Sequence, residues 1–270
     1  MLGSFTLTSS DGTTVPLGVD PRRLVAYLAV HPRAQRRGAL AADLWPGVPS
    51  DAAQRLLDDA VAALAVPGLV TAAETPQGPT LALGEDVAVD LAEALALVRA
   101  LSEGSAGRRP DISLLSADIL PGWTAPWLAV ERERFRQIRL AALEELSLRL
   151  SNAGEHDDAV AVAKAAVHAA PSRESARRAL IEAYLAQGDI AAAVAQYDDY
   201  QELLRSSVGG PAPSGLDGLL PPPSPVWPVL RARRPMPRSA VVLPGLRSVR
   251  RASGSARRLV AGGSVPGTTR

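Results

Sequence analysis

The side chains that most often carry out catalysis are scarce in this chain. It has no cysteine and three histidines, His31, His156 and His168, which stand far apart with no carboxylate or cysteine framing them. Without cysteine there is no thiol nucleophile, disulfide or thiolate metal ligand. Gly209 and Gly210 lack the lysine and the helix that follow in a phosphate-binding loop. The residue types therefore predict a protein that is not an enzyme and has no cofactor and no metal site.

Arginine is the residue type that is left for recognition. Residues 221–270 hold ten Arg and no acidic residue, whereas residues 1–220 carry a net charge of −9, so that the whole chain is near neutral at +1. A basic segment of this kind can bind DNA without sequence preference or fold back on an acidic body. A spacer without either role is the third interpretation.

Two adjacent arginines, Arg36 and Arg37, directly precede a predicted helix, with Arg33 close by. Guanidinium groups next to the amides of a helix N-terminus can hold phosphate groups. The sequence therefore makes Arg36 and Arg37 candidate phosphate ligands, and a solvated turn is the alternative.

The elements that would position these arginines follow from the apolar pattern of residues 1–90. Alternation of apolar and polar residues predicts two strands joined by the turn signal of Asp11 and Gly12. Asp20 and Pro21 then open the first of three helices, and Trp45, beside a turn, is predicted to be core. The expected order is strands 2–7 and 14–17, helices from residue 21, over 37–44 and over 52–64, and strands 69–73 and 80–83. This order is typical of a winged helix-turn-helix.

The second part of the chain, from residue 89 to about 206, is predicted to be helical almost throughout. Five positions recur at a spacing of 34 residues: Leu146, Leu150, Gly154, Ala159 and Val160 return as Leu180, Tyr184, Gly188, Ala193 and Val194. This is the period of tetratricopeptide helix pairs, which bury their apolar faces by stacking. Trp123 and Trp127 lie in a predicted loop, which we expect them to anchor against the helical domain.

The predicted fold class is mostly α, with an N-terminal winged helix followed by an all-α tetratricopeptide-like domain. The domain boundaries that we expect are 1–90, 91–220 and a disordered Arg- and Pro-rich tail at 221–270. Residues 216–220 are expected to pack on the helical body. The sequence shows no secretory signal and no apolar stretch of about 20 residues, which predicts a soluble, cytoplasmic protein.

Taken in order, several stretches of residues 1–206 resemble the bacterial transcriptional activator domain family, of the antibiotic-regulatory-protein type. Its members join an OmpR-like winged helix to a tetratricopeptide-like domain. The resemblance rests on residues 2–5 (LGSF), 15–17 (VPL), 22–28 (RRLVAYL), 40–46 (LAADLWP), 111–127, 131–135 (ERERF) and 140–145 (LAALEE).

The resemblance implies a DNA-binding transcriptional regulator, expected to be an activator, with residues 52–64 as its recognition helix. Gln54 and Arg55 are then candidate DNA contacts beside Arg36 and Arg37, unless Arg55 pairs within its helix. The implied partners are double-stranded promoter DNA and, through the helical repeats, RNA polymerase or another regulator. No membrane partner is expected, and a homodimer stays open.

The same helix also carries features that oppose DNA binding. Asp58 and Asp59 stand where the family usually has arginines, residues 75–79 of the wing contain no basic residue, and residues 1–90 have a net charge of −4. These carboxylates would repel phosphates. The alternative function is therefore a protein-interaction module whose winged helix has lost DNA binding.

Overall fold

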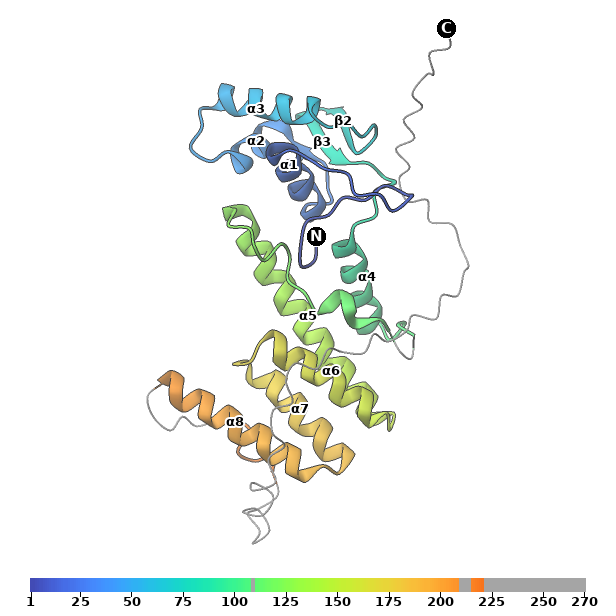
Figure 1. The fold of residues 1–270 in the computed structure, drawn as a ribbon, viewed down its shortest axis with the longest axis vertical. Coiled ribbons are helices and arrows are strands. Elements are labelled where there is room, and N and C mark those ends of the chain that lie inside the picture. The colour runs from blue at the N-terminus through green and yellow to red at the C-terminus, as the bar shows by residue number, and fades with distance from the viewer. Residues whose placement is uncertain (108–109, 209–214, 221–270) are drawn as a thin grey trace. The chain divides into compact units, whose positions relative to one another are not determined.

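A computed structural model describes residues 1–107, 110–208 and 215–220 of the chain (Figure 1). The described chain is mostly helical and divides into two compact units. The first consists of residues 1–95 and 118–133, and the second of the remaining described residues. The first unit therefore takes in a segment, 118–133, that the sequence places with the helical domain.

The first unit is a winged helix-turn-helix, as predicted. Its helices are α1 (Val19–Val30), α2 (Arg37–Leu44) and α3 (Ser50–Ala62), and its strands are β1 (Gln35–Arg36), β2 (Val70–Thr75) and β3 (Gly78–Leu83). The strands form an antiparallel sheet in the order β1-β3-β2. The β2–β3 hairpin is the wing, and its turn is closed by Gly78, whose φ of 107° favours glycine.

The core of this unit comes from the apolar stripes of its three helices. Leu24, Leu28, Leu40, Leu44 and Leu57 are all fully buried, and they meet in one cluster with Leu81 of β3. Leu24 and Leu28 are four residues apart, as are Leu40 and Leu44, so each pair lies on one helix face. Because these leucines face the core, the opposite faces of α2 and α3 are exposed to solvent.

The boundaries of four predicted elements, α1, α3, β2 and β3, differ from the prediction by one or two residues. Helix α1 begins at Val19, with Gly18 rather than Asp20 as its N-cap, and α3 begins at Ser50 instead of residue 52. Strand β1 was not predicted, because two residues are too short to show a periodicity. Helix α2 has the predicted bounds. Trp45 is 8% exposed in the core, also as predicted.

The predicted N-terminal strands do not form. The turn is present, since the Gly12 amide donates to the Ser9 carbonyl and the Val15 amide to the Leu7 carbonyl. Only isolated bridges flank it, Thr8 with Thr14 and Leu2 with Ile119. Residues 2–7 alternate between apolar and polar types, but they do not pair with residues 14–17 as a strand. Leu2 instead forms a bridge with Ile119, in the segment 118–133 of the same unit.

The second unit is built from helix pairs. The chain continues through α4 (Asp90–Ser102), the short η1 (Ile112–Leu115), α5 (Pro126–Asn152), α6 (His156–Ala169), α7 (Glu174–Gln187) and α8 (Ile190–Val208). Helix α7 packs against both α6 and α8. The repeat positions Leu146 and Leu180 are both buried, and the turn glycines Gly154 and Gly188 have φ of 77° and 83°. The tetratricopeptide-like prediction is confirmed.

The segment after α8 packs on the helices, as expected. Leu216 is fully buried in a cluster with Ile181, Ala193 and Tyr200. The tail predicted at 221–270 lies outside the described residues. Among residues 1–107, 110–208 and 215–220, no helix is both long and apolar enough to cross a membrane.

Candidate nucleic-acid interface

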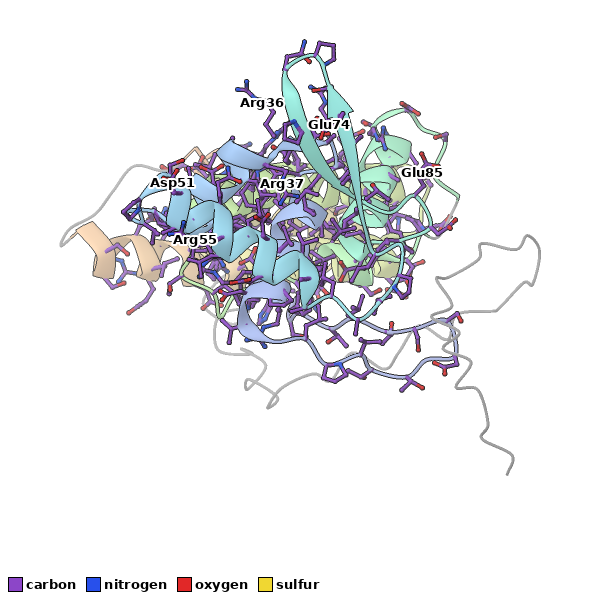
Figure 2. All side chains as sticks on the ribbon, turned by 90° about the horizontal axis from the view of Figure 1, so that it is seen from above. Arg36, Arg37, Asp51, Arg55, Glu74 and Glu85 are labelled. Carbon is purple, nitrogen blue, oxygen red and sulfur yellow. The ribbon has the colours of Figure 1, made fainter. Side chains whose placement is uncertain are left out.

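The four predicted site residues come from two helices and one strand of the first unit. Arg36 ends β1 and is the N-cap of α2, and Arg37 is the first residue of α2. Gln54 and Arg55 lie one turn into α3. Figure 2 looks down on α3 and shows Arg55 on that helix, with Arg36 projecting beside the wing near Glu74.

The start of α2 and the first half of α3 are in direct contact. A Cβ placed on Gly38 would lie 3.6 Å from the amide nitrogen of Gln54, so the side chain of Gln54 lies against the backbone of α2. Arg37 forms an ion pair with Asp58, one turn further along α3. The structure thus brings Arg36, Arg37 and Gln54 together around one helix junction.

Three of the four predicted residues are free to bind a ligand. Among the described residues, Arg36, Gln54 and Arg55 make no side-chain hydrogen bond or ion pair. Arg55 therefore does not form the intrahelical pair that was its alternative interpretation. Arg36 and Arg55 are exposed, while Gln54 is half-buried against α2. Their donors are of the types that contact phosphates and base edges.

The acidic residues share this surface with the arginines. Asp51, Asp58 and Asp59 are all exposed on α3, and Glu74 is exposed on the wing. The ion pair with Arg37 offsets the negative charge of Asp58. The side chain of Asp58 is 62% exposed and that of Arg37 is 21% exposed. One acidic charge of α3 is therefore offset within the protein, and one of the predicted basic contacts is engaged at the same time.

The segment 118–133 supports the helix-turn-helix from behind, which the sequence did not reveal. The ring of Trp127 packs edge-on to the ring of Tyr27 at a centroid distance of 5.0 Å. The ring of His31 stacks on the same tyrosine at a centroid distance of 4.2 Å. Trp123 stacks with Phe5 and lies 5.7 Å from the guanidinium carbon of Arg22. The sequence predicts that these tryptophans anchor the loop to the helical domain. That prediction is wrong, because the aromatic and cationic partners of both tryptophans belong to the first unit.

Hydrogen bonds fix the same segment. Arg132 donates to the carbonyl oxygens of Ile119, Leu120 and Trp123 at 2.6–3.0 Å, which closes the loop on the start of α5. The Tyr27 hydroxyl donates to Asp43 of α2 at 2.6 Å. Burial, followed by this hydrogen bond, raises the pKa of Tyr27 well above its ordinary value. The protonated Tyr27 side chain therefore links α1 to α2 by a hydrogen bond and contacts the segment 118–133 through Trp127.

The described residues thus combine a winged helix-turn-helix with a second unit of stacked helix pairs. Residues 89–219 match the family model of the bacterial transcriptional activator domain. Residues 89–219 therefore form a domain of this family, which confirms the resemblance drawn from the sequence. The family consists of transcriptional regulators and is not a class of enzymes.

Two chains among the solved structures match this chain, and EmbR is one of them. EmbR of Mycobacterium tuberculosis, in complex with a low-affinity phosphopeptide, is 22% identical to this chain with a TM-score of 0.48. The similarity covers 86% of this chain and 63% of that chain, so the chain spans less than two thirds of the EmbR structure. No curated protein matches the chain.

Proposed function

We propose that this protein regulates transcription, as an activator, by binding double-stranded promoter DNA through its winged helix. The observation that carries the proposal is the junction of α2 and α3, where Arg36 and Arg55 are exposed and uncommitted and Gln54 lies beside Gly38. These residues occupy the first half of α3 and the start of α2. In helix-turn-helix proteins those parts meet the major groove and the adjacent phosphates.

The roles follow from the chemistry of each side chain. Arg36, at the N-terminus of α2, would contact a phosphate together with the amides of the first helical turn. Gln54 and Arg55 would reach base edges, since glutamine can pair with adenine and arginine with guanine. Arg37 would act on a phosphate only after exchanging its partner Asp58.

The second unit would contact the transcription machinery. Its helix pairs present open faces of the kind that tetratricopeptide-like domains use for protein partners. RNA polymerase or another regulator is the partner class that the proposal includes, and a homodimer would place two winged helices on two half-sites.

Selection from a pool of random duplexes tests the proposal on the full chain. Sequencing of the bound fraction should reveal an enriched motif. Q54A and R55A should each relax the preference at one position of the motif and weaken binding about 10-fold. R36A should weaken binding to all sequences and lower the salt slope by about 1. R99A, which removes an exposed arginine of α4, is the matched control and should leave the binding unchanged.

A second function is favoured by the carboxylates of α3. Asp51, Asp58 and Asp59 are exposed there, and exposed acid is unfavourable against phosphates. On this alternative the winged helix is an interaction module for a protein with a basic surface. Binding that enriches no motif and is unaffected by R36A, Q54A and R55A would overturn the DNA proposal and leave this alternative.

A further inference from the structure

The second unit contains a groove between α5 and α7 with a volume of about 490 Å³. Its lining residues recur every three or four positions on each helix, which places them on one face of α5 and one face of α7. They are Ala141, Glu144, Glu145, Ser147, Leu148, Ser151 and Asn152 of α5, and Ser175, Arg178, Ala179, Glu182, Ala183 and Ala186 of α7. The volume lies within the range of typical ligand sites.

The base of the groove is apolar. Alanines of both helices line it, and beside them Leu148 is 50% exposed. This combination leaves room for one large apolar side chain. A flat aromatic ring resting on small side chains would cover Leu148 and remove its surface from water.

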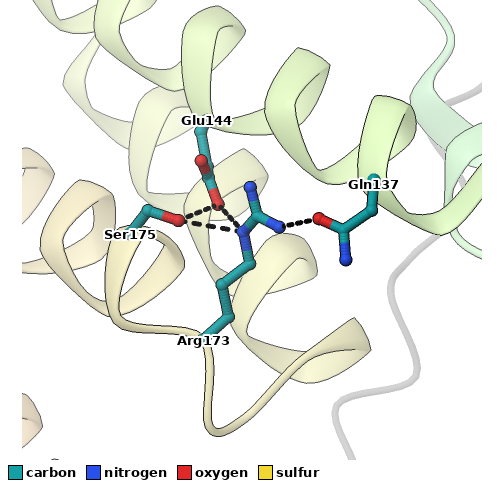
Figure 3. A network of polar contacts seen from close by, with 4 residues as sticks. All are labelled: Gln137, Glu144, Arg173 and Ser175. Atoms are coloured by element: carbon teal, nitrogen blue, oxygen red, sulfur yellow. Dashed lines mark hydrogen bonds and ion pairs between the residues drawn. The ribbon is translucent and has the colours of Figure 1, made fainter. Parts of the chain in front are cut away.

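Three glutamates and one arginine, Arg178, line the groove. Glu144 is held by Arg173 and Ser175, as Figure 3 shows. Glu145 pairs with Arg149 on its own helix. Glu182 is exposed and makes no side-chain hydrogen bond or ion pair among the described residues. Glu182 therefore offers a basic ligand a carboxylate that is unpaired within the part of the chain that the structure describes.

The chain after α8 is clamped to α7 at the edge of this groove. Arg178, a lining residue, donates to the carbonyl oxygen of Gly215 at 2.7 Å. A Cβ on residue 215 would lie 2.4 Å from a carboxylate oxygen of Glu174, so only glycine fits against the helix without a shift. Leu216 is buried, and the Tyr197 hydroxyl donates to Asp217 at 2.8 Å. The chain continues past Leu220 from this clamp.

The sequence that follows the clamp complements the groove. Residues 226–234 read VWPVLRARR, and Trp227 is the only aromatic residue of residues 221–270. Three arginines follow it with no acidic residue. A proline-rich linker can span about 3.1 Å per residue, so the six residues before Trp227 can bridge about 19 Å. From Arg178, which holds the clamp, to Ala186, the last lining residue of α7, the helix rises about 12 Å, so the linker is long enough to span that distance.

We propose that residues 226–234 bind in the groove between α5 and α7 of the same molecule. Trp227 covers Leu148 and the alanines, and the arginines lie along Glu145 and Glu182. The segment then occupies the face of the repeats that an external partner would use, so a partner must displace it. This self-contact is separate from the DNA contacts of α3 and does not depend on them.

The absence of cysteine from the chain allows a direct test by disulfide formation. The full chain carries V229C together with A186C, which is exposed in the groove. The matched control pairs V229C with A161C, an equally exposed position on α6 that does not line the groove. We expect the initial rate of intramolecular disulfide formation to be at least ten times higher for the groove pair.

Two additional changes test the chemistry of the contact. W227A in the groove pair should lower the rate to that of the control pair. R233E with R234E should lower it several-fold, and salt should lower it as well if the arginines bind Glu145 and Glu182. Equal rates for the groove and control pairs would overturn the proposal. Covalent dimers that form in place of the intramolecular disulfide would overturn it too, since the segment would then bind a second copy.

Discussion

Arg37, the first residue of α2, forms an ion pair with Asp58 on the exposed side of α3. The pair links the two helices of the helix-turn-helix across its solvent face. The pair also occupies both Asp58 of α3 and Arg37, one of the candidate phosphate ligands. Binding of a phosphate by Arg37 requires that this pair opens.

The first prediction concerns this pair. D58N releases Arg37 and removes one negative charge, whereas D59N removes one charge from the same helix without releasing an arginine. We expect D58N to strengthen DNA binding about 10-fold at low salt, and D59N to strengthen it less, since only the first provides a further phosphate contact. Titration of a labelled duplex at several salt concentrations measures both. Equal effects of the two variants would show that Arg37 does not reach the DNA.

The second prediction concerns the dependence of stability on alkaline pH. Burial and the bond to Asp43 raise the pKa of Tyr27 above its ordinary value of 10.0, and the pKa values of Tyr197 and Tyr200 are raised as well. Below pH 10 these phenols are protonated in both the folded and the unfolded state. Above pH 10 the unfolded state loses the protons first, so the free energy of unfolding should fall as the pH rises.

Y27F identifies the share that belongs to Tyr27. It should lower the free energy of unfolding by about 1 kcal/mol near neutral pH, because a hydrogen bond to Asp43 is lost. It should also make the decline above pH 10 shallower. Urea unfolding at pH 7 and at pH values from 9.5 to 11 measures both effects. An unchanged slope in Y27F would place the alkaline transition on the other tyrosines.

The third prediction tests the support that Trp127 gives to α1. W127A should destabilise the winged-helix unit by about 3 kcal/mol, because it removes a large ring from the face of Tyr27. W127F retains an edge-on aromatic contact and should cost less than half as much. Thermal unfolding followed by circular dichroism compares the variants. Equal losses would mean that a phenyl ring at this position retains none of the stabilisation that the indole provides.

The fourth prediction concerns the close approach of Gly84 to Gly68. A Cβ on Gly84 would lie 2.0 Å from the carbonyl oxygen of Gly68, while one on Gly122 would meet no atom within 4 Å. G84A should therefore destabilise the protein by about 2 kcal/mol or more through a shift of the backbone at the end of β3. G122A should leave the stability nearly unchanged. Denaturant unfolding of the pair isolates the steric cost.

The fifth prediction compares two arginines of the second unit. Arg173 joins α7 to α5 through Glu144 and Gln137 and also contacts Ser175 (Figure 3). Arg149 pairs with Glu145, one turn away on its own helix. R173A should lower the free energy of unfolding by about 2 kcal/mol, since it leaves the half-buried Glu144 without its cation. R149A should cost under about 0.5 kcal/mol, as exposed pairs within a helix do. Similar losses would contradict a role of Arg173 in joining the helices.

The sequence by itself determined the fold class and most of the helices. The spacing of Leu40 and Leu44, and of Leu146 and Leu180, is local or repetitive, and burial of such stripes decides a helix before its neighbours are known. The candidate residues Arg36, Arg37, Gln54 and Arg55 could be named because the order of the elements alone locates the two helices of the helix-turn-helix.

Only the tertiary structure decided which of these residues are free and where the segment 118–133 belongs. The partner of Arg37 is Asp58, 21 residues away, whereas Arg55 makes no pair with its neighbours among the described residues. Leu2 pairs with Ile119, and Trp127 packs on Tyr27. Such contacts depend on the distances between side chains from remote parts of the chain. Periodicity reports which face of an element is buried, but it does not report against what that face is buried.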